Sequence, residues 1–255
     1  MLEAYALSDV GRVRTNNEDC ALILPEIGLY LLADGMGGAR AGEMASRLAV
    51  DTVAEVVRQA WQRDPQVLLS AVEEANRRVL EASNSDPQLE GMGTTLVAVL
   101  ESGDELAIAS VGDSRAYLLD EAGFRAITED QTWVHEVGRP LGLDEQSLRN
   151  HPMRHVLTMA IGVGGALSIH YYVIRLHPQA LLLMCSDGLH GVVEPSVIEN
   201  ILRDDSDSHG GLEYKCRSLI EAAKNAGGPD NVTCILLRGA PVWPSPSDHQ
   251  YGTAG

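Results

Sequence analysis

Leu29-Tyr30-Leu31-Leu32-Ala33-Asp34-Gly35-Met36-Gly37-Gly38 is the stretch of this 255-residue chain that decides its fold. The uncharged run Leu29–Ala33 predicts a buried strand, and Asp34-Gly35 marks the place where that strand ends. An Asp-Gly pair is an ordinary turn former, because Asp caps its own backbone and Gly accepts positive φ. A carboxylate at a strand end is also a hard oxygen ligand for a divalent cation. The stretch alone leaves both interpretations open.

Further strands and helices are predicted on both sides of this stretch. In Ala41–Gln59 and Val67–Ala82 the apolar residues recur at spacings of three and four, which indicates two amphipathic helices. The region from about 130 to 165 is polar and is expected to form two short helices in a surface excursion. The other predicted strands are Glu3–Ser8, Ala21–Leu24, Thr94–Leu100, Leu106–Val111, Arg115–Leu119, Phe124–Ile127, Ile169–Leu176, Ala180–Cys185 and Asn231–Leu237, and the other helices Pro195–Leu202 and Gly211–Ala226.

Two groups of strands, each followed by a helix pair, favour an α+β fold. We expect a central β-sandwich of two antiparallel sheets flanked by helix pairs, in the layer order α-β-β-α, with a flap segment at about 130–165. A doubly wound parallel sheet is the alternative, but strict alternation of strand and helix is missing. Residues 1–238 are expected to be one domain, and the Pro/Ser-rich segment 239–255 a disordered tail.

The arrangement of Asp34 is repeated along the chain. Acidic residues meet strand ends in R-T-N-N-E-D (14–19), A-D-G-M-G-G (33–38), V-G-D-S-R (111–115), C-S-D-G (185–188) and G-G-P-D-N (227–231). Each motif singly is best interpreted as a turn. Strand ends at one edge of packed sheets converge, so five such carboxylates would repel one another in one cleft unless cations neutralised them.

Composition narrows the classes of partner. The chain carries 36 acidic and 19 basic residues, a net charge of −17, so no nucleic-acid partner is expected. Four dispersed cysteines indicate free thiols, and neither a signal peptide nor a membrane span is recognisable. We therefore expect a soluble, cytoplasmic protein with no membrane partner. A P-loop and a G-x-S-x-G motif are both absent from the sequence, and a dinucleotide fingerprint is incomplete.

Six motifs of this chain are the five above and G-M-G-T-T (91–95). In their order and spacing they resemble the motifs of the PPM-type (type 2C) metal-dependent protein serine/threonine phosphatases of the bacterial branch. The resemblance extends over residues 3–238. It implies hydrolysis of phosphoserine and phosphothreonine in proteins by a water that bridges two metal ions. A degenerate, non-catalytic binding module and a phosphatase of small metabolites are the alternatives.

The resemblance also implies roles for individual residues, with two or three Mn²⁺ or Mg²⁺ ions as cofactors. Asp34 would bridge two ions, Asp187 and Asp230 would complete the shell of the first, and Glu18 and the Gly35 carbonyl that of the second. Asp113, with Asp187, matches a third metal site. Asp19 would orient metal-bound water, and Arg14 would bind the phosphate.

The source of the leaving-group proton is left open by the sequence. Many eukaryotic family members have His where this chain has Met36. His155 is a candidate general acid, since it borders the flap; metal-bound water at the third site and His190 are the alternatives. The partners implied are phosphorylated proteins, substrates of a serine/threonine kinase, and the chain is expected to be a monomer.

Overall fold

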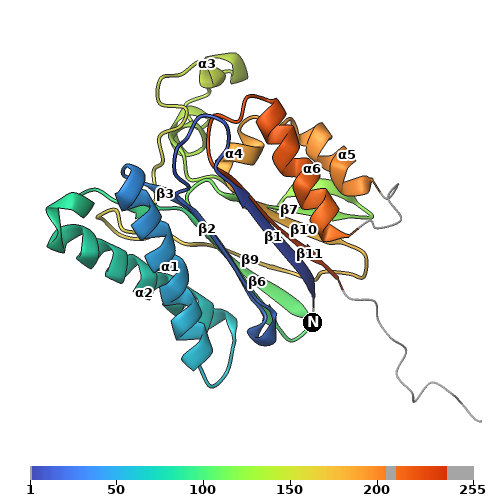
Figure 1. Ribbon diagram of the computed structural model, residues 1–255, viewed down its shortest axis with the longest axis horizontal. Helices are drawn as coiled ribbons and strands as arrows, with labels where there is room; N and C mark the ends of the chain where they lie inside the picture. Colours follow the sequence, from blue (N-terminus) through green and yellow to red (C-terminus); the bar gives the residue numbers. More distant parts are fainter. Residues whose placement is uncertain (1, 205–210, 240–255) are drawn as a thin grey trace, which may run out of the picture.

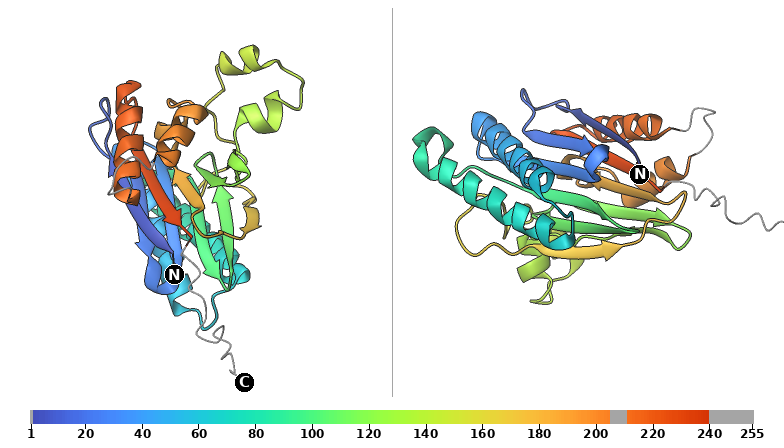
Figure 2. Two further views of the ribbon diagram at one scale, coloured as in Figure 1. Left: turned by 90° about the vertical axis from the view of Figure 1, so that its right-hand side faces the viewer. Right: turned by 90° about the horizontal axis from the view of Figure 1, so that it is seen from below.

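Two stacked antiparallel sheets with helices on their outer faces form the architecture of the computed structural model, which describes residues 2–204 and 211–239 (Figures 1 and 2). One sheet has the strand order β1-β11-β10-β7-β8 and the other β2-β3-β5-β6-β9, with β4 paired to β3. The strands are β1 Glu3–Asp9, β2 Asp19–Leu24, β3 Leu29–Met36, β4 Gly93–Thr94, β5 Leu96–Ser102, β6 Glu105–Val111, β7 Arg115–Asp120, β8 Gly123–Ala126, β9 His170–Ile174, β10 Leu181–Cys185 and β11 Val232–Arg238.

The helices are α1 Ala39–Gln59, α2 Pro65–Ser85, α3 Glu145–Arg149, α4 Asp187–His190, α5 Pro195–Arg203 and α6 Leu212–Asn225, with short 3-10 helices at Pro25–Ile27 and Pro87–Leu89 and a π-helix at Val134–Gly138. Helices α1 and α2 lie on the β2-β3-β5-β6-β9 sheet, and α5 and α6 lie on the other side of the sandwich (Figure 1).

Strand β3 shows why a central strand reads as an apolar run rather than as an alternating pattern. Leu29, Leu31 and Ala33 pack toward α1 and α2. Tyr30 and Leu32 point the other way, into the core between the two sheets. Side chains alternate between the faces of a strand, so a strand covered on both sides needs apolar residues at every position.

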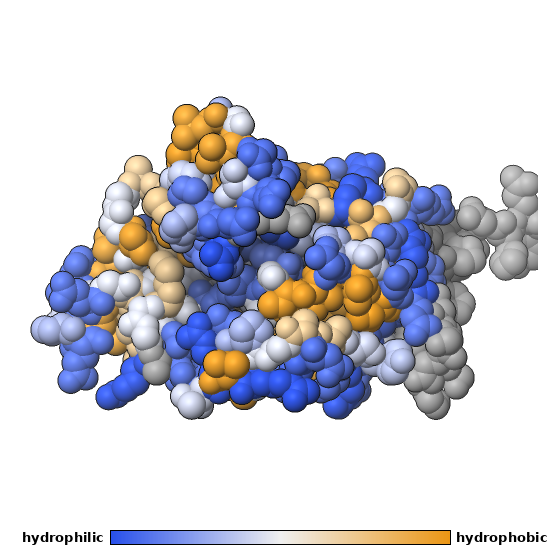
Figure 3. Space-filling model, turned by 90° about the horizontal axis from the view of Figure 1, so that it is seen from above, coloured by the Kyte–Doolittle hydropathy of each residue, from blue (hydrophilic) through white to orange (hydrophobic). Residues whose placement is uncertain are grey.

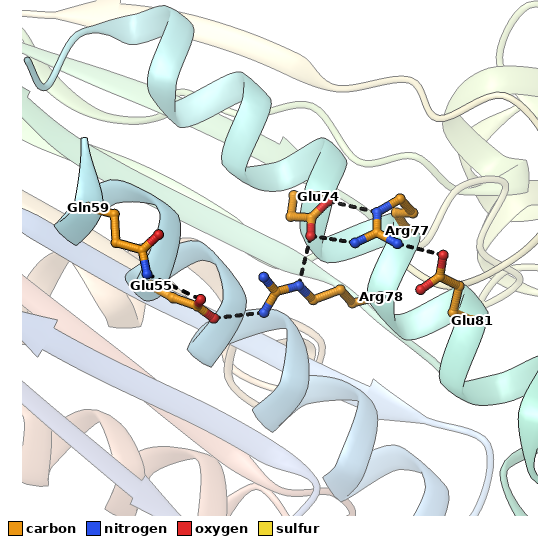
Figure 4. Close-up of polar contacts among 6 residues, drawn as sticks. All are labelled: Glu55, Gln59, Glu74, Arg77, Arg78 and Glu81. Atoms are coloured by element: carbon orange, nitrogen blue, oxygen red, sulfur yellow. Dashed lines mark hydrogen bonds and ion pairs between the residues drawn. The ribbon is translucent and has the colours of Figure 1, made fainter. Parts of the chain in front are cut away.

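Helix α2 begins at Pro65, two residues before Val67, where its predicted periodic stretch starts. Pro65 occupies the first turn, and the Asp64 side chain accepts a hydrogen bond from the backbone N–H of Val67 at 3.0 Å, which caps the helix. On its outer face, Arg78 donates to Glu55 of α1 at 2.7 Å and to Glu74 of its own helix at 2.8 Å, as Figure 4 shows. Because these side chains are only partly buried and remain open to solvent, the ion pairs are expected to add little stability.

The segment between β8 and β9 forms the flap, which projects from one end of the sandwich (Figure 2). An antiparallel bridge between Thr132 and Leu157 closes its base, and the π-helix and α3 lie between them. A second bridge joins Thr94 to Ile161 and ties the returning chain to β4. The predicted pair of short helices is confirmed.

The predicted α+β class and two-sheet sandwich are confirmed, and the doubly wound alternative is wrong because neighbouring strands run antiparallel throughout the described pairs. Helix α4 was not predicted, since its four residues read as a turn. The four cysteines are free thiols, three of them buried. Within residues 2–204 and 211–239, no helix has the length and apolarity that crossing a membrane requires. The predicted tail at 239–255 lies outside the described residues except for Gly239, and the domain boundary at 238 stays a prediction.

Candidate active site

A cleft of about 530 Å³ opens at the end of the sandwich beside the flap. Viewed from above, this face has a hydrophilic hollow with hydrophobic surface next to it (Figure 3). Most of the residues singled out in the sequence line this cleft, whereas Asp19 and His190 do not. The lining includes Arg14, Glu18, Asp34, Gly35, Asp113, His155, Asp187 and Asp230.

Asp34 is positioned by its backbone. Its N–H donates to the Thr95 hydroxyl at 3.0 Å, and its carbonyl accepts from the Thr94 hydroxyl at 2.9 Å. Asp34 is also the cross-strand partner of Asp19 in the β2–β3 ladder. The G-M-G-T-T motif therefore fixes the end of β3, in agreement with a structural role for its hydroxyls.

Glu18 reaches the cleft through contacts with two remote segments, the loop of Asn231 and helix α1. Its N–H donates to the Asn231 side chain at 2.8 Å, and its carbonyl accepts from the Ser46 hydroxyl at 2.6 Å. Gly42, in the first turn of α1, leaves the space for the carboxylate: a Cβ there would lie 1.9 Å from Glu18 Oε2. Gly35 is required for the same packing, because its Cβ would lie 2.1 Å from the Gly42 carbonyl oxygen.

Asp113 follows Gly112, whose φ of +94° selects glycine. The Gly112 N–H donates to the side-chain oxygen of buried Gln131 at 2.8 Å, and Ser114 hydrogen-bonds Thr95 at 2.7 Å. His190 Nε2 lies 2.9 Å from the Asp113 carbonyl oxygen, at the far end of α4 from Asp187. The turn that presents Asp113 is thereby held on three sides.

Asp230 lines the cleft as well. Its Oδ1 accepts from the Asn231 N–H at 2.8 Å, and its Oδ2 accepts from Arg14 Nη2 at 2.8 Å. Gly11, with φ of +79°, passes so close that a Cβ would lie 2.2 Å from the Asp230 carbonyl oxygen. The Arg14 side chain is half exposed, so the guanidinium lies at the rim of the cleft.

The electrostatics of the cleft are those of crowded carboxylates. Burial, with the Coulombic repulsion of Asp19, Asp187 and Asp113 next in size, raises the pKa of Asp34 well above its usual range. Burial and the charge of Asp187 raise the pKa of Asp113 to about 7. The pKa of Asp187 is raised as well, by burial first and then by Asp230.

The residues present fit a site for hard cations. Asp19 Oδ2 accepts from the Ser186 hydroxyl at 2.9 Å, whereas its buried Oδ1 has no hydrogen-bond partner. Burial raises the pKa of Asp19 to about 7. Buried, mutually repelling oxygens are the donors that Mg²⁺ and Mn²⁺ prefer. Across the described ranges, no three His, Cys, Asp or Glu side chains stand close enough to hold an ion in their present positions, so the acids share one cleft without forming a finished coordination shell.

The two candidate acids differ in position. His155 is exposed and lines the cleft. His190 is packed under the Asp113 turn, and burial lowers its pKa to about 4. His190 thus braces a loop and does not face the cleft.

Several residues that build the site were missed from the sequence. Asn231 joins Glu18, Asn16 and Val10 through its side chain, and Gln131 joins Gly112 to the Ser168 carbonyl. Asn231 stood next to a motif aspartate, which was a usable signal. Gln131 and Gly42 had no recognisable signal in the sequence, because their contacts are with residues remote in sequence.

A second and larger cavity, of about 1020 Å³, lies away from these acids. Leu119, Pro178, Gln179, Lys215 and Arg238 are among the residues that line it. None of the predicted site residues contributes to it.

Comparisons with known proteins identify relatives of this chain by sequence and by fold. The family model described as Protein phosphatase 2C matches residues 14–222. The serine/threonine phosphatase stp of Listeria welshimeri is 35% identical over 248 residues, which cover 92% of this chain and 95% of that protein. The crystal structure of the Mycobacterium tuberculosis serine/threonine phosphatase PstP/Ppp matches with a TM-score of 0.83 at 34% identity, covering 93% of this chain and 98% of the other. A structure of the PstP catalytic domain in complex with two manganese ions has a TM-score of 0.81 at 33% identity, covering 93% and 97%.

Proposed function

The chain belongs to the protein phosphatase 2C family and is a serine/threonine protein phosphatase, and we propose that its reaction takes place in the carboxylate cleft on bound divalent cations. The observation that carries this proposal is the convergence of Glu18, Asp34, Asp113, Asp187 and Asp230 on one cleft. Neither alternative, a non-catalytic module or a metabolite phosphatase, is favoured by the relatives.

Each acid has a place in the proposed site. Asp34, Asp187 and Asp230 would hold one cation, Glu18, Asp34 and the Gly35 carbonyl a second, and Asp113 with Asp187 a third. Support comes from the raised pKa values of Asp34, Asp113 and Asp187, since a cation would offset the repulsion between these groups. The two-manganese structure of PstP supports Mn²⁺ or Mg²⁺ as the cofactor.

Cations bound in the cleft would lower the pKa of a water molecule toward neutrality and offset negative charge on the phosphoryl oxygens. Asp19 lies at the back of the cleft with one carboxylate oxygen unpartnered, where it can orient a water by accepting its proton in a hydrogen bond. Arg14 at the rim can donate two parallel hydrogen bonds to phosphate oxygens. His155, on the flap side of the cleft, can donate a proton to the leaving alkoxide. Its side chain lines the cleft and is open to solvent.

A metal-dependence assay tests the proposal. The protein should hydrolyse p-nitrophenyl phosphate and phosphothreonine peptides in Mn²⁺, and EDTA should abolish both activities. Asp34→Asn should lower kcat at least about a thousandfold with the fold retained, because the loss of one ligand charge weakens two cation positions. Asp104→Asn, at an exposed turn, is the matched control and should be unaffected. Full activity in EDTA would end the proposal.

The biological setting follows from the proposed reaction. The substrates are phosphoproteins, and the class of enzyme that must supply them is a serine/threonine protein kinase. We place the protein in the cytoplasm as a monomer. Size-exclusion chromatography with light scattering checks the monomer directly.

A further inference from the structure

Part of the lining of the catalytic cleft is apolar. Met36 at the end of β3 and Val156 and Leu157 of the flap are among the residues that line it. Val163 extends the same surface: a Cβ at Gly93 would lie 2.8 Å from Met36 Cε and 2.9 Å from Val163 Cγ2, so both side chains border the same glycine. Segments that are remote in sequence thus contribute to one strip of apolar side chains.

The strip is accessible. Val156 is 43% exposed and Val163 is 46% exposed. Single exposed valines are common on protein surfaces, and Val173 on β9 is exposed to the same extent, at 46%. Val156 differs from Val173 in lining the same cleft as the carboxylates, and Val163 differs from it in bordering the same glycine as Met36 of that cleft.

The backbone beneath the strip is held in place. The Val156 carbonyl accepts from the Trp133 N–H at 2.9 Å, and Leu157 forms the bridge to Thr132. On the other side, Ile161 is paired with Thr94, and the Gly162 N–H donates to the Asn76 side chain of α2 at 2.8 Å. A surface fixed in this way loses little conformational entropy when a ligand covers it.

The rest of the lining has a different chemistry. It includes Arg14 and Asn231 together with the acids. A phosphorylated side chain that enters the cleft therefore brings its neighbours close to both polar and apolar side chains. An acidic neighbour would meet repulsion from a chain of net charge −17, whereas an apolar neighbour could cover the strip.

We propose that the phosphoprotein substrates of this enzyme carry an apolar side chain within two residues of the phosphorylated one, and that this side chain packs on the strip of Met36, Val156, Leu157 and Val163. The inference rests on the proposed function and adds the substrate class. It assigns a specificity to the flap side of the cleft that the acids themselves cannot provide, since they bind cations rather than the peptide.

A series of phosphothreonine peptides tests the inference. Leu, Ala or Glu is placed in turn at each of the two positions before and after the phosphothreonine, and kcat/KM is measured in Mn²⁺. At one position at least, Leu should exceed Ala by about tenfold, since partial burial of a Leu side chain is worth about that factor. Glu at that position should be poorer than Ala.

A double variant locates the preference. Val156→Thr with Val163→Thr keeps the shape of the strip and makes it polar, so the Leu-to-Ala ratio should fall to about twofold. Val173→Thr, a valine of equal exposure away from the cleft, should keep the wild-type ratio. Each ratio compares two peptides on the same preparation, so a general loss of activity cancels.

Hydrolysis of p-nitrophenyl phosphate distinguishes a failure of this inference from a failure of the proposed function. If it proceeds in Mn²⁺ while Leu and Ala peptides react equally at every position, the inference is wrong and the proposed function stands. A Leu preference that survives unchanged in the double variant also overturns the inference. If the protein hydrolyses neither p-nitrophenyl phosphate nor any phosphopeptide, both fail together.

Discussion

Arg14 donates from Nη2 to Asp230 Oδ2 at 2.8 Å, so the side chain proposed to bind phosphate is paired with one proposed to bind a cation. The contact raises the pKa of Arg14, the hydrogen bond to Asp230 being the largest cause. A cation held by Asp230 would compete with the guanidinium for the same carboxylate. Cation binding would therefore release Arg14 toward the incoming phosphate.

Replacing Arg14 should affect the KM for phosphopeptides and the Kd of Mn²⁺ differently. In Arg14→Ala the KM for a phosphothreonine peptide should rise about 10- to 100-fold, because hydrogen bonds to a charged phosphate are lost. The Kd of Mn²⁺, measured by calorimetry, should fall or stay equal, because Asp230 loses a competing charge. Arg175→Ala, another exposed arginine in ion pairs, is the control. Weaker Mn²⁺ binding in Arg14→Ala would contradict the proposed competition.

Gly42→Ala separates helix stability from site geometry. Alanine in a helix is favoured over glycine by about 1 kcal/mol, yet a Cβ here would meet Glu18 Oε2 at 1.9 Å. We expect a folded protein whose Glu18 carboxylate is displaced, with Mn²⁺ affinity lowered about tenfold and phosphatase activity lowered with it. Gly164→Ala, where a Cβ would meet nothing within 4 Å, should leave both unchanged. Unaltered Mn²⁺ affinity in Gly42→Ala would show that Glu18 does not contribute to the site.

Gln131→Met tests the link between the flap and the Asp113 turn. It removes the hydrogen bonds to the Gly112 N–H and the Ser168 carbonyl, at about 1–3 kcal/mol each for the buried groups left unpaired. The melting temperature should fall, and the KM for phosphopeptides should rise more than the KM for p-nitrophenyl phosphate, since only the peptide reaches the flap wall. Gln59→Met, on the exposed face of α1, is the control. Equal effects on both substrates would indicate a purely structural role for Gln131.

The stability of the metal-free protein should depend on pH. Asp19 and Asp113, with pKa values raised to about 7, keep their protons in the folded state at pH values where the unfolded chain has lost them. The free energy of unfolding should therefore fall as pH rises from about 4 to 7, by up to about 4 kcal/mol per group. His190, whose pKa is lowered to about 4, opposes part of this trend.

Cations should remove that penalty by offsetting the charge. The increase in melting temperature on adding Mn²⁺ should thus be larger at pH 7.5 than at pH 5.5, which differential scanning fluorimetry in Mn²⁺ and in EDTA measures. Asp113→Asn should show a shallower pH dependence in EDTA than the wild type. A Mn²⁺ effect independent of pH would contradict the account of the crowded carboxylates.

The sequence by itself determined the elements and the acids at their ends. Apolar runs such as Leu29–Ala33 and the periodicity of Val67–Ala82 placed the strands and the long helices within a few residues of their bounds, since those signals are local. The cap at Asp64 was predictable for the same reason. Helix α4 was not, because a single turn is shorter than the period that would reveal it.

Only the tertiary structure decided how the acids are supported. Glu18 is held by Asn231, which is 213 residues away, and is accommodated by Gly42 on a different element. Gln131 joins two loops that the sequence leaves unrelated. The physical reason is that strand ends are local events, whereas the distance between them depends on sheet register and packing, which are set by contacts between residues far apart along the chain.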